Sequence, residues 1–193
     1  MDRRAFLAAG VTGVGVVTAG CSGLGGTTNL VNPDVETQDG GREKYLTYRR
    51  GDKRLVTVGF DQRTVPATAT DQFGFRISVP HSRNTTIESF RFDLRAPRSS
   101  IDPPADVYLE SPSGGLWPDI TFREVENRWT RIALEDTGEL GEGTMTFELI
   151  IAPNSAPATE IGIRTELELS SSGSLLNRRY RVDTSTEFEP VTE

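Results

Sequence analysis

Residues 161–169 read IGIRTELEL, and their apolar side chains fall at every second position. Ile161, Ile163, Leu167 and Leu169 share one side of an extended chain, and Arg164 and the glutamates share the other. Successive side chains of a β-strand point to opposite faces, so this segment predicts a strand with one buried and one wet face. Other strands with one buried face should show the same alternation.

The same period of two recurs along the chain, and no window shows the 3.6-residue period of an amphipathic helix. The clearest repeats are residues 73–79, 90–95, 145–151 and 180–188, and the shorter candidates are residues 45–48, 55–60, 107–109, 120–123 and 130–134. Residues 50–52, which read RGD, lie between two of these segments and are typical of a hairpin turn. We therefore predict an all-β fold with about nine strands.

Strands with polar outer faces must bury their apolar inner faces against another sheet. The economical arrangement is an antiparallel two-sheet β-sandwich, of which the immunoglobulin-like fold is one form. The paired cysteines of true immunoglobulin domains are absent, because Cys21 is the only cysteine in the chain. The strand order therefore stays open at this stage.

The first twenty residues, MDRRAFLAAGVTGVGVVTAG, have the layout of an export signal. Two arginines precede a short uncharged apolar run that ends in small residues. The run is too short and too rich in glycine for a comfortable membrane span, which needs about 20 apolar residues. The alternative interpretation is an uncleaved N-terminal anchor followed by an incidental cysteine.

Two short motifs make the export signal specific. Arg3, Arg4, Phe6 and Leu7 resemble the R-R-x-F-L core of the twin-arginine motif. Paired arginines at the start of an export signal indicate the twin-arginine export route. Residues 18–21, which read TAGC, resemble a lipobox, in which small residues precede the cysteine that receives lipid. Together they resemble the exported lipoproteins of halophilic archaea, over about the first tenth of the chain.

The resemblance has implications for location and departs mildly from the common pattern. It implies that the twin-arginine translocase exports the chain already folded and that lipid on Cys21 anchors it at the outer face of the cytoplasmic membrane. Asp2 stands where Ser or Thr is commoner, and Thr18 stands where Leu is commoner. A durable anchor needs two acyl or equivalent chains, because one chain of myristoyl length binds only reversibly.

These patterns divide the chain into three parts. We expect the export signal at residues 1–20, the lipidated cysteine with a flexible linker at residues 21–42, and the β-sandwich at residues 43–193. The linker is rich in Gly, Thr, Asn and Asp, and some twenty flexible residues reach roughly 25 Å on average. A second interpretation has Leu30, Val31 and Val35 pack as an edge strand of the domain, and the sequence leaves it open.

The charge restricts the partners. The whole chain carries −7, and residues 1–20 carry +1 from Asp2, Arg3 and Arg4, so the remainder carries −8. Such a balance argues against nucleic acid and against electrostatic docking on anionic lipid. Lys44 and Lys53 are the only lysines, and excess acid with arginine in place of lysine is similar to the proteins of salt-loving archaea.

Catalytic and metal sites find little support in the residues. His81 is the only histidine and no G-x-S-x-G occurs, so neither serine hydrolysis nor zinc has its usual set of groups. We expect no cofactor, no metal site and no enzyme, and we interpret His81 as a turn residue.

Two sets of carboxylates are candidate sites. The acidic residues Glu135, Asp136, Glu139 and Glu142 alternate with glycines, which suits either a calcium loop or, in our preferred interpretation, a solvated hairpin. A second group, Glu166 and Glu168, would suit acid–base work on sugars, but they lie on the face expected to be wet. Surface charge is the simpler account of both sets.

Contact residues are the better candidates. Leu116 and Trp117 lie in a predicted loop and would contact a protein or a glycan if exposed. A glycan site predicts that Trp117 converges with Tyr108 or Trp129. Asn84 opens the glycosylation sequence Asn-Thr-Thr.

The function that the sequence favours is a lipid-anchored, non-enzymatic β-sandwich that binds a protein or glycan through its loops. An accessory or structural subunit of a membrane complex is the alternative, and it predicts an extended apolar patch on one sheet face. A carbohydrate-active enzyme that uses carboxylates alone ranks last.

Overall fold

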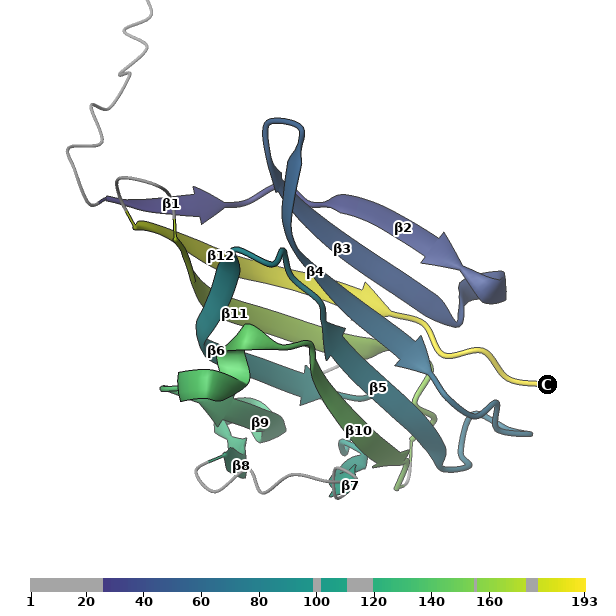
Figure 1. Ribbon diagram of the computed structural model, residues 1–193. Helices are drawn as coiled ribbons and strands as arrows, with labels where there is room; N and C mark the ends of the chain where they lie inside the picture. The colour runs from purple at the N-terminus through teal and green to yellow at the C-terminus, as the bar shows by residue number, and fades with distance from the viewer. Residues whose placement is uncertain (1–25, 99–101, 111–119, 155, 173–176) are drawn as a thin grey trace, which may run out of the picture.

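A computed structural model of the chain describes residues 26–98, 102–110, 120–154, 156–172 and 177–193. It contains twelve strands in two six-stranded sheets, and its described helices are three short 3-10 turns, η1 (Asp39–Gly41), η2 (Glu126–Arg128) and η3 (Gly138–Glu142). The all-β, two-sheet sandwich predicted from the sequence is thereby confirmed, with twelve strands rather than nine (Figure 1).

Each sheet has its own strand order. Sheet A runs in the order β1 (Thr27–Leu30), β12 (Arg178–Phe188), β11 (Ile161–Ser171), β6 (Thr85–Arg95), β9 (Trp129–Leu134), β8 (Thr121–Val125). Sheet B runs in the order β2 (Asp34–Gln38), β3 (Glu43–Arg50), β4 (Lys53–Gln62), β5 (Phe73–Val79), β10 (Met145–Ala152), β7 (Asp106–Glu110). Neighbouring strands are antiparallel, except that β1 runs parallel to β12.

The core lies between the sheets, where the apolar positions of the period-two pattern meet. Phe75 on β5 packs edge-on against Phe188 on β12, with ring centroids 5.1 Å apart. Phe90 on β6 meets Phe147 on β10 at 4.9 Å. Both pairs join one sheet to the other, and all four rings are buried. Burial of these inner faces is what drives the two sheets together.

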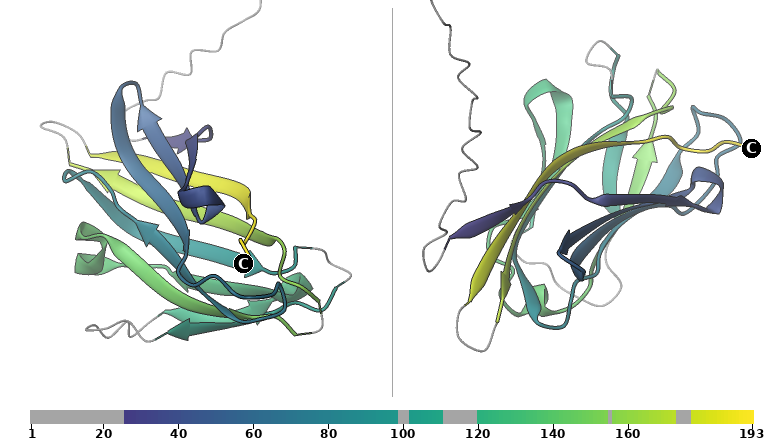
Figure 2. Two further views of the ribbon diagram at one scale, coloured as in Figure 1. Left: turned by 90° about the vertical axis from the view of Figure 1, so that its right-hand side faces the viewer. Right: turned by 90° about the horizontal axis from the view of Figure 1, so that it is seen from above.

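The N-terminal strands cross from one sheet to the other. β1 lies beside β12 in sheet A, and the chain then passes through Pro33 into β2, which pairs with β3 in sheet B (Figure 2). Residues 27–30 and 34–38 of the segment expected to be a linker are therefore sheet, in two strands of different sheets rather than the one edge strand of the second interpretation. Leu30 is buried, whereas Val31 and Val35 are 61% and 59% exposed.

The strand orders place the edges of the sandwich in two pairs. β1 and β2 form the edges on one side, and β8 and β7 form the edges on the other. In Figure 1 the first pair lies at the top and the second at the bottom. The chain therefore enters the sandwich on the side opposite β7 and β8.

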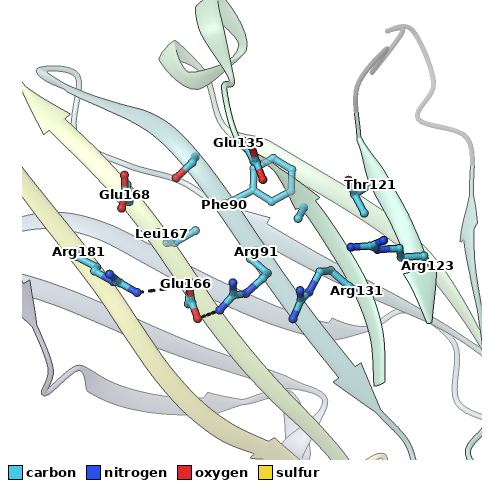
Figure 3. A pocket seen from close by; sticks show the side chains of 12 residues that line it. Phe90, Arg91, Thr121, Arg123, Arg131, Glu135, Glu166, Leu167, Glu168 and Arg181 are labelled. Atoms are coloured by element: carbon cyan, nitrogen blue, oxygen red, sulfur yellow. Dashed lines mark ion pairs between the residues drawn. The ribbon is translucent and has the colours of Figure 1, made fainter. Parts of the chain in front are cut away.

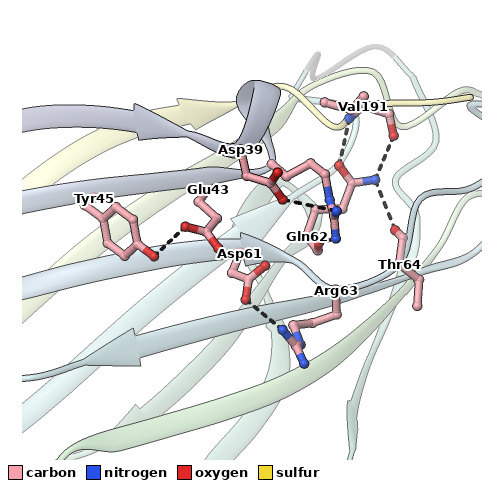
Figure 4. Close-up of polar contacts among 9 residues, drawn as sticks. Asp39, Glu43, Tyr45, Asp61, Gln62, Arg63, Thr64 and Val191 are labelled. Carbon is pink, nitrogen blue, oxygen red and sulfur yellow. Dashed lines mark hydrogen bonds and ion pairs between the residues drawn. The ribbon is translucent and has the colours of Figure 1, made fainter.

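A buried glutamine fastens the C-terminal segment. The side chain of Gln62 at the end of β4 is fully buried, and its Nε2 donates to the carbonyl oxygen of Val191 at 2.8 Å. Its Oε1 accepts a hydrogen bond from the Val191 backbone N–H at 2.7 Å (Figure 4). The Gln62 side chain thus satisfies both backbone hydrogen-bonding groups of Val191, a residue beyond the end of β12 that has no partner among the described strands to do so.

Candidate functional site

Exposed aromatic side chains mark the side of the sandwich formed by β7 and β8. Tyr108 on β7 is 53% exposed and Phe122 on β8 is 37% exposed. Residues 111–119 connect these two edge strands and include Leu116 and Trp117, which lie outside the described residues. The predicted contact segment thus connects two edge strands of different sheets, each of which carries an exposed aromatic residue.

The backbone edges of this side are also available. Among the described residues, β7 pairs with β10 alone and β8 pairs with β9 alone. On β7 the side chains of Val107 and Leu109 pack toward the core, while Asp106, Tyr108 and Glu110 are exposed. A free strand edge of this kind presents N–H and C=O groups that an extended segment of another protein can pair with.

Trp129 does not join Tyr108. It lies on the outer face of sheet A, yet only 8% of it is exposed, because the guanidinium of Arg164 stacks 4.1 Å above its ring. The position of Gly162 makes room for the indole, since a Cβ there would stand 2.9 Å from the Trp129 ring. Of the two predicted partners for Trp117, Tyr108 alone offers an accessible ring.

A polar depression of about 190 Å³ lies on the outer face of sheet A (Figure 3). Its charged lining consists of four arginines and three glutamates: Arg91, Arg123, Arg131, Arg181, Glu135, Glu166 and Glu168. Strands β6, β8, β9, β11 and β12 and the residue after β9 supply them. The sequence marked the three glutamates of this set, but as two separate groups, and none of the four arginines, since the strands that bring them together are distant in the chain.

Most of these charges are already paired. Arg131 donates two hydrogen bonds to Asp93, and they raise the pKa of the Arg131 guanidinium. Glu166 forms an ion pair with Arg91 and lies 3.6 Å from Arg181. These pairs favour surface charge over acid–base chemistry as the role of Glu166. Among the described residues Arg123 is the arginine of this lining without an ion pair.

The outer face of sheet B is polar as well. Arg76 on β5 forms an ion pair with Glu148 on β10, with Nε 2.6 Å from Oε1, and a second with Asp61 on β4, with Nη1 3.7 Å from Oδ2. At β3, Tyr45 donates a hydrogen bond of 2.8 Å to Glu43, and this bond, with burial and nearby carboxylates, raises the pKa of Tyr45 to about 12 (Figure 4).

The extended apolar patch that an accessory subunit predicts is therefore not seen among the described residues. Their exposed large hydrophobic side chains are Val31 and Val35 on one side and Tyr108 and Phe122 on the other. Neither pair lies in the middle of an outer sheet face, where the ion pairs are.

His81 and the acidic stretch take structural positions. The His81 ring is half-buried, with Nε2 2.9 Å from the carbonyl oxygen of Gly143 and Nδ1 3.1 Å from that of Ser82. Asp136 accepts a hydrogen bond from the Gly138 backbone N–H at 3.0 Å, while Glu135 and Glu142 are exposed. Within the described part of the chain, no three His, Cys, Asp or Glu side chains gather as metal ligands would.

The remaining candidate residues fall in two groups. Asn84 is exposed in the turn between β5 and β6, so its side chain is accessible for the attachment of a glycan. Arg3, Arg4, Phe6, Leu7 and Cys21 lie outside the described residues. The helices that the structure does describe are all too short or too polar to cross a bilayer.

The comparisons with known proteins give one family and a set of remote folds. A family model described as "Domain of unknown function (DUF8121)" matches residues 27–192. No curated protein matches the chain.

Three solved structures illustrate the remote similarity. The seventh ScaB type I cohesin from Pseudobacteroides cellulosolvens is 12% identical with a TM-score of 0.40, over 67% of this chain and 89% of that one. A cohesin module from a Clostridium perfringens family 33 glycoside hydrolase is 13% identical with a TM-score of 0.42, over 72% and 97%. The human F-spondin reeler domain is 8% identical with a TM-score of 0.37, over 85% and 94%.

Proposed function

The chain belongs to the DUF8121 family, and we propose that it is a lipid-anchored, non-enzymatic binding module exported to the outer face of the cytoplasmic membrane. In this proposal the twin-arginine translocase exports it, lipid on Cys21 anchors it, and the β7–β8 side with its 111–119 loop binds a partner protein. Neither a cofactor nor nucleic acid takes part.

One observation carries the proposal: the strands nearest Cys21 in the chain and the strands with exposed aromatic residues form opposite edges of the same sandwich. The chain leaves Cys21, enters the sheets at β1 and β2, and presents Tyr108 and Phe122 on the other pair of edge strands. A partner at the β7–β8 side would therefore meet a surface that the anchor does not cover. Exposed aromatic side chains beside a free strand edge are typical of recognition surfaces.

A protein fits this side better than a glycan. Sugar rings are usually held between or upon aromatic rings, and Trp129 is withdrawn under Arg164. The strand edge of β7, in contrast, offers main-chain pairing and an outward Tyr108 for side-chain specificity. Leu116 and Trp117 remain the predicted anchors of this contact.

Two measurements test the anchor and the contact separately. Mass spectrometry of the membrane-bound protein should find a mature N-terminus at Cys21 carrying lipid, and Cys21→Ser should release the protein from membranes. A bare Cys21 on the mature chain, or an intact leader on a cytosolic product, would remove the proposed location.

The contact is tested with a photo-crosslinking amino acid at position 108 and, as a matched control, at position 35 on the opposite edge. Both residues are more than half exposed, so accessibility is comparable. We expect position 108 to give one dominant protein adduct in intact cells, lost with Trp117→Ala, and position 35 to give none. Equal adducts from both positions would contradict a partner site at the β7–β8 side.

A further inference from the structure

Six cationic side chains gather at the corner where β1 begins, in a chain whose charge is negative overall. Two of them end β3, two begin β4 and two begin β12, and all six are exposed. We call this set the basic corner: Arg49, Arg50, Lys53, Arg54, Arg178 and Arg179.

Contacts between the sheets bring these segments together. Thr27 and Thr28 at the start of β1 pair with Arg179 and Tyr180 on β12. The Tyr180 hydroxyl in turn accepts a hydrogen bond of 3.2 Å from Arg50, at the tip of the β3–β4 hairpin. Figure 1 shows the hairpin tip at the top of the sandwich, above β1, and the first residues of β1 and β12 at the upper left.

Few carboxylates offset this positive charge. Within the corner they are Asp34, which lies 2.8 Å from Arg49, and Asp52 in the hairpin turn. Glu88 and Glu168 line a depression together with Arg179, and the acidic turn η3 contacts β6 nearby. The net charge, which argued against anionic lipid, is therefore spread unevenly, and the corner nearest the N-terminus is positive.

The length of chain before β1 limits how far this corner can lie from a lipid on Cys21. Thr27 is six residues after Cys21. Each residue spans at most about 3.6 Å, so the start of β1 stays within about 20 Å of the anchored cysteine. Attraction between exposed charges acts over about 10 Å at 0.1 M salt and about 3 Å at 1 M. A corner held this close can reach direct contact with the headgroups, which such short-range attraction requires.

We propose that the basic corner docks on anionic phospholipid headgroups and so fixes the orientation of the sandwich on the membrane. The inference rests on the anchor at Cys21 proposed above. The β1–β12 end then faces the bilayer, and the β7–β8 side faces away from it. Arginine suits this role because its planar guanidinium can bind phosphate oxygens in pairs.

The two lysines of the chain make the orientation measurable. Lys53 belongs to the basic corner, whereas Lys44 lies at the other end of the same hairpin, where its Nζ donates to the carbonyl oxygen of Glu187. We would couple residues 21–193, which contain every described strand, through the single thiol to maleimide lipid in vesicles. Acetylation of the two lysines is then compared by mass spectrometry.

The expected result is a loss of Lys53 labelling relative to Lys44 on vesicles of phosphatidylglycerol and phosphatidylcholine. The ratio should fall about five-fold against vesicles of phosphatidylcholine alone, the change that 1 kcal/mol of docking produces. Arg54→Glu with Arg179→Glu should restore the ratio. Arg63→Glu with Arg123→Glu makes the same change of charge away from the corner and should leave the protection intact.

The same ratio on both kinds of vesicle would overturn the proposal, and no charged variant is needed to see it. Equal loss of protection in both double variants would also overturn it, because net charge alone would then explain the effect. Since the thiol is coupled chemically, neither result depends on whether cells attach lipid to Cys21. Failure of the docking is thus distinguishable from failure of the anchor.

Discussion

Asp93 on β6 accepts two hydrogen bonds from Arg131 on β9, from Nε at 2.7 Å and from a terminal nitrogen at 2.8 Å. The Asp93 side chain is 5% exposed and that of Arg131 is 26% exposed, so the pair is partly shielded from water. Two parallel charge-assisted bonds with this geometry are stronger than ordinary surface ion pairs. They hold two strands of sheet A together beneath the polar depression.

We expect Asp93→Ala to lower the free energy of unfolding by about 2 kcal/mol, because it leaves the Arg131 guanidinium without its partner. Urea denaturation measures the change. The matched control is Glu124→Ala, whose ion pair with Arg128 is 3.9 Å long with both side chains more than half exposed. That control should cost less than about 0.5 kcal/mol, and equal losses would contradict the role given to Asp93.

Gly141 in η3 has no room for a side chain. A Cβ at this position would lie 1.9 Å from the carbonyl oxygen of Ile87 and 2.5 Å from the Thr137 hydroxyl. Gly141→Ala should therefore destabilise the fold by about 1–3 kcal/mol, since the backbone must shift. Gly143→Ala, where a Cβ meets nothing within 4 Å, should stay within about 0.5 kcal/mol of the natural protein in the same thermal or urea melts.

Tyr45 should make stability fall at alkaline pH. Its pKa is raised from 10.0 to about 12, first by the hydrogen bond to Glu43, so the folded state keeps the proton longer than the unfolded state does. The contribution of Tyr45 is fully present below pH 10 and is lost as the pH rises through about 12.

The measurement is a series of urea melts between pH 10 and 12, with tyrosinate absorbance as a second signal. The free energy of unfolding of Tyr45→Phe should vary less with pH than that of the natural protein across this window. Glu43→Gln, which removes the largest cause of the raised pKa, should make Tyr45 ionise at a lower pH. An unchanged absorbance titration in Glu43→Gln would show that the hydrogen bond does not set this pKa.

The contact between Phe75 and Phe188 should carry much of the cohesion between the sheets, because both rings are fully buried. Phe188→Ala removes a ring that sheet A contributes, and we expect a loss of about 3–5 kcal/mol by calorimetry or urea melts. Phe122→Ala, at a ring 37% exposed, is the matched aromatic control and should cost far less. Similar losses would contradict the position of the core.

Strands in the middle of the sheets were predictable because one face of each is buried. Residues 161–169 form most of β11, and residues 73–79 match β5 (Phe73–Val79). The edge strands β7 and β8 matched only the short candidates 107–109 and 120–123, and β2 (Asp34–Gln38) carries no such signal. Every residue of β2 is exposed, and backbone pairing with β3 holds it. Period-two reasoning cannot find a strand with no buried face.

The candidate sites depended on pairings between segments distant in the sequence. Trp129 is covered because Arg164 and Gly162 lie on a strand more than thirty residues away. The basic corner likewise joins residues 49–54 to residues 178–179, and the summed charge of the chain hides it. Leu116 and Trp117 were singled out by residue type and loop context, and their contact role stays a prediction.

The parallel pairing of β1 with β12 makes the first strand the neighbour of the last. Thr27–Leu30 has no other adjacent strand in its sheet among the described residues, so β1 cannot pair until β12 (Arg178–Phe188) has been synthesised. A product cut short before Arg178 would leave Thr27–Leu30 without a partner strand. Pairing of the first strand is thus a late step of folding that depends on the last strand of sheet A.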